Sequence, residues 1–165
     1  IVQDAISPCT WPEQKAPRIQ QVLRLITDRN GSLSLDFIGD MEVAAARQWL
    51  EELPGVGPKT SAAVISFSSL RGKALPVDSH HFRVACRLGI IEEKLGEAKA
   101  NRVLEGLLPL HFNAQEMYDH HQVMMRHGQN ICFHHRPNCT ACVLLHVCPT
   151  GQATLSKEIA PAADT

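Results

Sequence analysis

The stretch Leu53-Pro-Gly-Val-Gly-Pro-Lys59 decides the fold of this chain. On both sides of it, apolar residues recur at three- and four-residue spacing, which predicts one helix over residues 41–53, capped by Asp40, and another over residues 59–70. Two glycines that are separated by a single residue allow a tight turn with positive φ. The sequence therefore predicts two helices joined by a short glycine–proline hairpin.

The rest of the chain also shows helical spacing, and no segment alternates apolar and polar residues as a strand would. We therefore predict an all-α fold, a helical bundle or partial helical barrel with a helix-hairpin-helix motif and a C-terminal cysteine-rich loop. The expected units are a helical domain over 12–128 with its hairpin at 53–59, the loop over 129–149 and a flexible tail over 150–165. Further helices are expected over 12–28, 78–88, 95–108 and 114–127.

The composition is that of a globular chain with nearly balanced charge. Of the 165 residues 44% are hydrophobic, and the net charge is −1. The apolar runs fall far short of the roughly 20 residues that span a bilayer, which argues against a membrane protein. Basic residues are concentrated in residues 55–90, where Asp78 is the only acidic residue, and again in residues 120–136. Such patches can bind a polyanion, although short charge blocks are also typical of ordinary solvated faces.

The hairpin suits contact with a phosphate. Glycine removes side chains from the turn, so the backbone N–H groups can approach an anion closely. The next helix begins at the hairpin, and its unpaired N–H groups and dipole also favour an anion. A turn that merely joins two helices is the simpler interpretation of the two glycines alone.

Lys59 and Asp78 form a candidate catalytic pair. Burial or nearby positive charge lowers the pKa of a lysine, and a neutral amine can attack a carbonyl-like carbon to form a Schiff base. A nearby carboxylate can accept protons from that amine or stabilise positive charge on the substrate. Taken singly, a surface lysine and a plain helix N-cap are the simpler explanations of the two residues.

Four of the six cysteines fall within 17 residues, which favours a metal or cluster site over scattered disulfides. Four close thiolates can hold either an iron–sulfur cluster or a tetrahedral zinc ion, and a pair of disulfides is a third interpretation. The spacing alone leaves these three open, with His134, His135 and His146 as further candidate zinc ligands. The four candidate cysteine ligands are Cys132, Cys139, Cys142 and Cys148.

Taken together, these motifs resemble the endonuclease III branch of the helix-hairpin-helix DNA glycosylases. The resemblance extends from about residue 16 to residue 149, and the cysteine spacing is similar to the cluster-binding loop of that family. The segments that carry it are Leu53–Val64, Pro76–His80, Arg83–Gly89, the pair His120-His121 and the pair His127-Gly128.

The resemblance implies a bifunctional glycosylase that excises a damaged base, by family default an oxidised pyrimidine, and cleaves the strand by β-elimination. Lys59 would be the nucleophile and Asp78 its catalytic partner, because relatives that only excise bases carry another residue at the lysine position. The four cysteines would hold a [4Fe–4S] cluster, and the partner would be double-stranded DNA with a damaged or abasic site. The implied DNA contacts are Gly55, Val56, Gly57, Lys59, Thr60, His80, Arg83 and Arg136.

The family's helical barrel begins upstream of the segments found here. Base flipping needs a pocket and a wedge residue, which those upstream helices supply. We therefore expect an N-terminal truncation, or a second chain or missing N-terminal segment that completes the barrel. Without such cover, residues 59–70 should expose an apolar groove beside Lys59, or bury it against another copy or against Ile1–Trp11.

Two other functions stay open on the sequence alone. One is a non-catalytic DNA-binding fragment of such an enzyme, and the other is a small zinc-stapled helical interaction protein. A bacterial source would place the protein in the cytoplasm with the nucleoid, and a eukaryotic source in the nucleus or an organelle.

Overall fold

The computed structural model describes residues 1–159 as a series of helices joined by short loops. No strand occurs among those residues, so the all-α prediction is confirmed for this part of the chain. None of the helices within residues 1–159 has the length and hydropathy needed to cross a membrane. The helices are α1 (Val2–Ala5), α2 (Pro12–Asn30), η1 (Asp36–Asp40), α3 (Val43–Glu51), α4 (Pro58–Phe67), α5 (Ser79–Arg87), η2 (Glu93–Leu95), α6 (Glu97–Leu107), α7 (Ala114–Asn130), η3 (Cys139–Ala141), η4 (Leu145–Val147) and α8 (Pro149–Ile159), where η marks a 3₁₀-helix.

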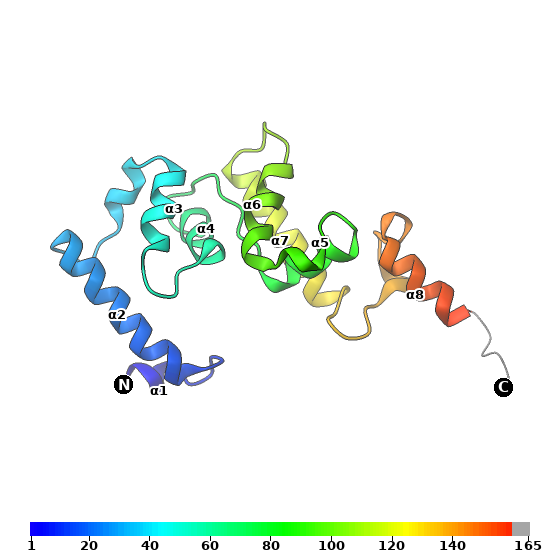
Figure 1. Cartoon of the computed structure of the whole chain (residues 1–165), viewed down its shortest axis with the longest axis horizontal. Helices are drawn as coiled ribbons and strands as arrows, with labels where there is room; N and C mark the ends of the chain where they lie inside the picture. The colour runs from blue at the N-terminus through cyan, green and yellow to red at the C-terminus, as the bar shows by residue number, and fades with distance from the viewer. Residues whose placement is uncertain (160–165) are drawn as a thin grey trace.

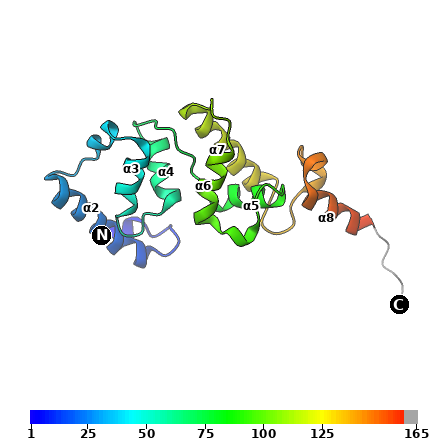
Figure 2. The same ribbon diagram turned by 45° about the horizontal axis from the view of Figure 1, so that its top comes forward.

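The helices form an elongated row (Figure 1). α1 and α2 lie at one end, α3 and α4 follow, and α5, α6 and α7 form the next group. Residues 131–148, which we name the cysteine loop, and α8 lie at the opposite end in both Figure 1 and the tilted view of Figure 2. α3 packs against α4 and α5 packs against α7, while α6 contacts both α4 and α5. α6 therefore joins the hairpin group to the group that follows it.

Local sequence signals set most helix ends. Proline occupies the first position of α2 and α4, where its missing N–H leaves no bond unmade. Gly31 ends α2 with a φ of 71°, a left-handed conformation that suits glycine. Asn113 and Glu116 form a reciprocal capping box at the start of α7. The prediction of Asp40 as a helix cap is wrong, because Asp40 ends η1 and α3 begins after Glu42 without a side-chain cap.

Two hydrophobic cores underlie the row of helices. The first lies between α2, η1, α3 and α4 beneath the hairpin, and the second lies between α5, α6 and α7. The backbone passes from the first core to the second through residues 74–77, which are all buried. The first core contains Ile26, Ile38, Ala46, Leu50, Leu53, Ala62, Ile65 and Ala74, and the second contains Leu75, Val77, Val84, Ala85, Ile91, Ala100, Leu104 and Met124.

A buried asparagine fixes residues 74–77, the segment that connects the two cores. Asn101 of α6 is fully buried and donates its side-chain amide to the carbonyl of Leu75 at 2.8 Å. Its Oδ1 accepts a hydrogen bond of 2.6 Å from Arg47 of α3, which also pairs with Glu105 at 2.7 Å. Because buried polar groups cost free energy when they are unpaired, this network defines the path by which the chain reaches Asp78.

The two ends of the chain differ from the sequence-based expectations. The sequence predicts a flexible tail from residue 150, but helix α8 runs to Ile159 and packs against η3, η4 and α5. The last part of that predicted tail, residues 160–165, lies outside the described residues. At the other end α1 packs against α2, and the side chains of Ile1 and Trp11 are exposed. This apolar segment does not form a cover over α4.

Candidate active site

The hairpin forms as predicted, but only one of its glycines has a positive φ. Gly55 has a φ of 79°, whereas Gly57 is extended with a φ of −108°. The N–H of Val56 donates to the carbonyl of Leu53 at 3.0 Å and closes the turn. A methyl group at Gly57 would meet nothing within 4 Å, so this glycine leaves the hairpin open to an approaching ligand.

α4 begins directly at the hairpin. The carbonyl of Gly57 accepts the N–H of Ser61 at 2.9 Å, and the side chains of Lys59 and Thr60 are exposed in the first turn. The free N–H groups of this turn, the helix dipole and the lysine side chain together favour an anion such as a phosphate. Lys59 is thus a solvent-accessible amine and not the buried lysine that activation by desolvation would require.

Asp78 is fixed at the start of α5. Its Oδ1 accepts a hydrogen bond of 2.8 Å from the backbone N–H of His81, and the residue is half-buried. The simple interpretation of Asp78 as an N-cap is therefore confirmed. Within residues 1–159 no hydrogen bond or ion pair to Oδ2 is found, so the cap leaves one carboxylate oxygen available for chemistry.

His121 of α7 lies between α4, which carries Lys59, and α5, which Asp78 caps. Its side chain is 2% exposed, and the centroid of its ring lies 5.3 Å from that of Phe67 on α4 and 6.1 Å from that of His81 on α5. Burial lowers the pKa of His121, the Asp78 carboxylate opposes this effect, and the charge of Lys59 adds to it. α4 and α5 both pack against α7, so the helix that carries Lys59 and the helix that Asp78 caps meet at His121.

His81, His120 and His121 form a cluster of neighbouring rings between α5 and α7. His81 is fully buried, and its ring centroid lies 5.2 Å from that of His120. Burial, together with the neighbouring histidines, lowers the pKa of His81 to about 4, and burial also lowers the pKa of His120. Neither ring nitrogen of His81 has a hydrogen-bond partner in the described part of the chain. The rings therefore form a neutral wall between α5 and α7 at pH 7.

Phe67 is an exposed apolar residue of α4, two turns along the helix from Lys59. It is 41% exposed, whereas Ile65 of the same helix is buried. Phe67 packs edge-on against Tyr118 of α7 at 5.5 Å, and the guanidinium of Arg71 lies 5.5 Å from the Tyr118 ring centroid. The apolar groove that the sequence predicts beside Lys59 stays a prediction.

The four predicted cysteine ligands surround one cavity of about 30 Å³ where α5, α7 and the cysteine loop meet. Burial raises the pKa of the Cys139 thiol, and the other three thiols raise it further. No group of three or more His, Cys, Asp or Glu side chains within residues 1–159 is spaced to hold a metal ion. Four thiolates around one cavity can hold either a tetrahedral zinc ion or an iron–sulfur cluster.

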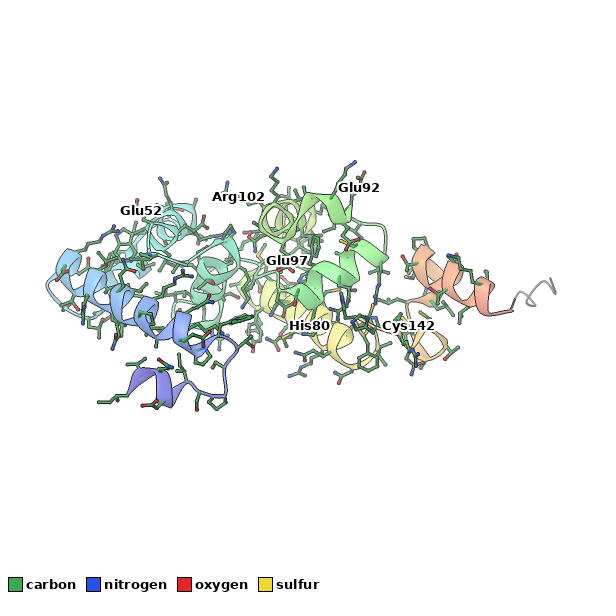
Figure 3. The ribbon with its side chains drawn as sticks, turned by 60° about the horizontal axis from the view of Figure 1, so that its bottom comes forward. Glu52, His80, Glu92, Glu97, Arg102 and Cys142 are labelled. Carbon is green, nitrogen blue, oxygen red and sulfur yellow. The ribbon has the colours of Figure 1, made fainter. Side chains whose placement is uncertain are left out.

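Arg83 binds the cysteine loop from α5. Its Nε donates to the carbonyl of Cys132 at 3.0 Å, and its Nη2 donates to the carbonyl of Gly128 at 2.7 Å. The same Nη2 lies 3.1 Å from Nδ1 of His80. His80 and Cys142 are labelled in Figure 3, at the end of the α5–α7 group that faces the loop. Arg83 therefore attaches α5 to α7 and to the cysteine loop, and the contact of His80 and Arg83 with DNA stays a prediction.

Arg87 is a site residue that sequence reasoning does not identify. It donates to the carbonyls of Phe133 at 2.6 Å and His134 at 2.9 Å, and to Sγ of Cys132 at 3.2 Å. A signal for this role is present in the sequence, because Arg83 and Arg87 are four residues apart and so share one face of α5. The two arginines together attach the cysteine loop to α5, the helix that Asp78 caps.

Arg136 keeps its side chain available for a ligand. It is exposed in the cysteine loop, and no hydrogen bond or ion pair of this side chain is found within residues 1–159. Its backbone has a φ of 50°, a left-handed conformation that non-glycine residues adopt rarely. Such positions are enriched at functional sites, which agrees with the predicted contact between this loop and DNA.

Curated relatives of the chain include proteins named Endonuclease III and a DNA glycosylase/AP lyase. The chain is 28% identical to Endonuclease III of Sulfolobus acidocaldarius over 145 residues, which cover 88% of this chain and 60% of the relative. It is 32% identical to Endonuclease III of Bacillus subtilis over 138 residues, which cover 84% of this chain and 57% of the relative. It is 29% identical to DNA glycosylase/AP lyase ROS1 of Arabidopsis thaliana over 147 residues, 81% of this chain and 10% of the relative. A scan against protein families finds no match.

Solved structures show the same fold. A non-covalent Endonuclease III–DNA complex matches 94% of this chain and 66% of its own, with a TM-score of 0.75 and 28% identity. A trapped Endonuclease III–DNA covalent intermediate matches 93% of this chain and 66% of its own, with a TM-score of 0.74 and 28% identity. The similarity therefore extends over nearly the whole chain, while the chain spans only about 60% of the length of its endonuclease III relatives.

Proposed function

We propose, from the premise that this chain is a homologue of the endonuclease III branch of the helix-hairpin-helix DNA glycosylases, that it acts in base-excision repair as a DNA glycosylase with abasic-site lyase activity. One observation carries the proposal: Lys59 is exposed in the first turn of α4 directly after the hairpin, and Asp78 is held at the start of α5 by the bond of its Oδ1 to the N–H of His81. An accessible amine, a carboxylate and a phosphate-binding turn are the groups that imine chemistry on a DNA sugar requires.

Lys59 and the hairpin have separate tasks in this mechanism. The N–H groups of the hairpin and of the first turn of α4 bind a phosphate, which fixes the sugar relative to the amine. The neutral Lys59 amine attacks C1′, the bond from C1′ to the base breaks, and the base leaves with a proton. The sugar ring then opens to an imine, and loss of a C2′ proton expels the 3′ phosphate. We propose oxidised pyrimidines as the bases removed, as the resemblance implies.

Asp78 accepts a proton and stabilises positive charge in these steps. The oxygen that caps α5 fixes the direction of the carboxylate, and the other oxygen can accept a proton from the lysine amine. The same carboxylate stabilises the positive charge that develops on the sugar as the base departs. Both tasks need a side chain in a defined place, which the N-cap provides.

We propose that the four cysteines of the loop ligate one [4Fe–4S] cluster. Their arrangement around a single cavity supports this assignment. When bound, the cluster cross-links the loop and fixes its shape, and it takes no part in bond breaking. Arg136 would then face the DNA duplex from an ordered loop, and Thr60 would contact it beside the hairpin.

Borohydride trapping on a duplex with one abasic site tests the function. Reduction converts the imine into a stable amine, so the protein should become covalently linked to the DNA. Lys59→Gln should abolish the cross-link and retain DNA binding, while Lys99→Gln, which removes an exposed lysine of α6, should leave the cross-link unchanged. Undiminished trapping by Lys59→Gln would overturn the assignment of the nucleophile.

A DNA-binding module without catalysis is the second candidate, because the hairpin and the first turn of α4 can bind a phosphate without any bond being broken. Base excision needs a pocket for the flipped base, whereas cleavage at an existing abasic site does not, so the trapping assay is the more direct one. Binding of the abasic duplex without any trapped product would support this second candidate. Any trapped product that depends on Lys59 would exclude it.

A further inference from the structure

Arg18 of α2 lies against the hairpin at Gly55. A methyl group built on Gly55 would overlap Cδ of Arg18 and would lie 3.0 Å from both its Nε and its Nη1. The stem of the arginine therefore occupies the space that a side chain at residue 55 would need, and its guanidinium lies beside the turn. This contact and the φ of 79° are independent reasons for a glycine at this position.

The guanidinium of Arg18 is not neutralised by the protein. None of the ion pairs or hydrogen bonds found within residues 1–159 includes this side chain, which is exposed. Its neighbours on the helix face, three and four residues away, carry no acid; they are Gln14, Lys15, Gln21 and Val22. By contrast, Arg47, Arg83 and Arg87 direct their donors to protein oxygens.

We propose that Arg18 is a further phosphate-binding residue of the hairpin and makes one ionic contact with the DNA phosphate held there. The proposal rests on the function proposed above, because it requires DNA at the hairpin. The backbone N–H groups supply only partial charge, and the Lys59 amine must lose its charge to act as a nucleophile. A guanidinium stays charged at every relevant pH and matches phosphate geometry with parallel N–H donors.

Two substitutions separate the charge of Arg18 from its packing. Arg18→Met keeps an unbranched apolar stem over Gly55 and removes the charge, whereas Arg18→Lys keeps a charge on a similar stem. Arg24→Met is the matched control, because Arg24 is also an exposed arginine of α2 but lies six residues further along the helix. Thermal unfolding of all three variants reports any effect on packing.

The experiment measures the Kd of the full chain for a duplex with a tetrahydrofuran abasic-site analogue, between about 50 and 200 mM salt. Each phosphate contact adds about 0.9 to the slope of log Kd against log salt concentration, so Arg18→Met should lower the slope by about 0.9. Arg18→Lys should keep most of the slope, and Arg24→Met should keep all of it. An undamaged duplex should show the same loss, because phosphate contacts carry no sequence information.

The outcomes distinguish this proposal from the proposed function. An unchanged slope in Arg18→Met, with or without a lower unfolding temperature, overturns the proposal, and so does an equal loss in Arg24→Met. Borohydride trapping at saturating DNA should stay unchanged in the control Arg24→Met, because Arg24 lies six residues further along α2. If the wild-type chain is trapped and Arg18→Met keeps its slope, only this inference fails; a wild-type chain that neither binds nor traps DNA fails both.

Discussion

The hairpin and the cysteine loop are held in place in opposite ways. The hairpin rests on a core whose members, such as Leu50 and Ile65, are 2% exposed. In the cysteine loop, residues 131–148, no residue is buried. The loop is held by donors from Arg83 and Arg87 and by its own thiols around one cavity. Burial of apolar side chains thus stabilises the hairpin, while the loop depends on hydrogen bonds from α5 and on the proposed ligation of its thiols.

Magnitudes explain this difference. Ordering one residue costs roughly 1–2 kcal/mol, and a hydrogen bond returns only about 1 kcal/mol. A loop without buried apolar groups therefore cannot hold a single conformation through a few arginine contacts. Metal ligation contributes on the order of 10 kcal/mol in small metal-bound domains, which is enough to fix such a loop.

The largest effect is expected from removing a ligand of the loop. Cys139→Ser should reduce the iron content from about four atoms per chain to near zero, because a [4Fe–4S] cluster needs all four thiolates. Limited proteolysis should then cut within the cysteine loop, while the helices around the two cores stay protected. Iron analysis and mass mapping of the fragments measure both effects.

Cys9→Ser is the control for this loss, because Cys9 is an exposed thiol far from the loop in sequence. It should retain full iron content. One zinc and no iron in the wild-type protein would contradict the cluster assignment. A loop that resists proteolysis in Cys139→Ser would contradict the comparison itself, since the loop would then hold its shape without a ligand.

The next effect compares two leucines, one from each region. Leu50→Ala should lower the free energy of unfolding by about 3 kcal/mol, because it leaves a cavity in the core beneath the hairpin. Leu144→Ala, in the half-buried part of the loop, should lower it by less than about 1 kcal/mol. Urea denaturation followed by circular dichroism measures both. Equal losses would show that the loop shares the core of the helical region.

The same contrast explains what the sequence predicts well. The hairpin helices and the Asp78 cap depend on neighbouring residues, so residue spacing places them, although the predicted cap Asp40 belongs to η1 and not to α3. The pairing of Lys59 with Asp78 is a prediction from the family resemblance, and the structure adds that Asn101 fixes the segment that leads from α4 to Asp78. The four cysteines were grouped by spacing alone, and the structure places them around one cavity.

Residue spacing and capping patterns do not predict contacts between segments that are far apart in the sequence. Arg18 meets Gly55 across 37 positions, and the ring of His81 meets that of His121 across 40. Nothing in a helical pattern pairs these residues, because their contact depends on how whole helices pack. α8 is a related case, since its packing against η3 and η4 compensates for a polar sequence that favours a frayed end.

The smallest of these effects concerns pH and the buried histidines of the helical region. In the unfolded chain His81 has an ordinary pKa of 6.5, whereas in the folded protein burial and the neighbouring histidines lower it to about 4. Above pH 6.5 both states are neutral, and His81 adds no pH dependence. As the pH falls below 6.5 the unfolded chain binds a proton first, so folding stability is lost progressively until about pH 4.

At pH 5 this linkage amounts to about 2 kcal/mol for His81. His81→Phe preserves an aromatic ring of similar size and removes two nitrogens that lack partners within residues 1–159. The variant should therefore lose about 2 kcal/mol less than the wild type between pH 7 and pH 5, when urea unfolding is measured at each pH. A residual dependence should remain, because burial also lowers the pKa of His120 and of His121.

His146→Phe provides the matched change in the cysteine loop, where the side chain is exposed. Folding removes no such ring from water, so this substitution should leave the pH dependence of unfolding as it is in the wild type. The charges that face His81 are Asp78, His120 and His121, and Asp78→Asn should increase the loss at pH 5, since the carboxylate favours the protonated ring. Equal changes in His81→Phe and His146→Phe would show that the buried histidines between α5 and α7 do not cause the pH dependence of unfolding. The helical region and the cysteine loop would then not differ in the desolvation of their histidines.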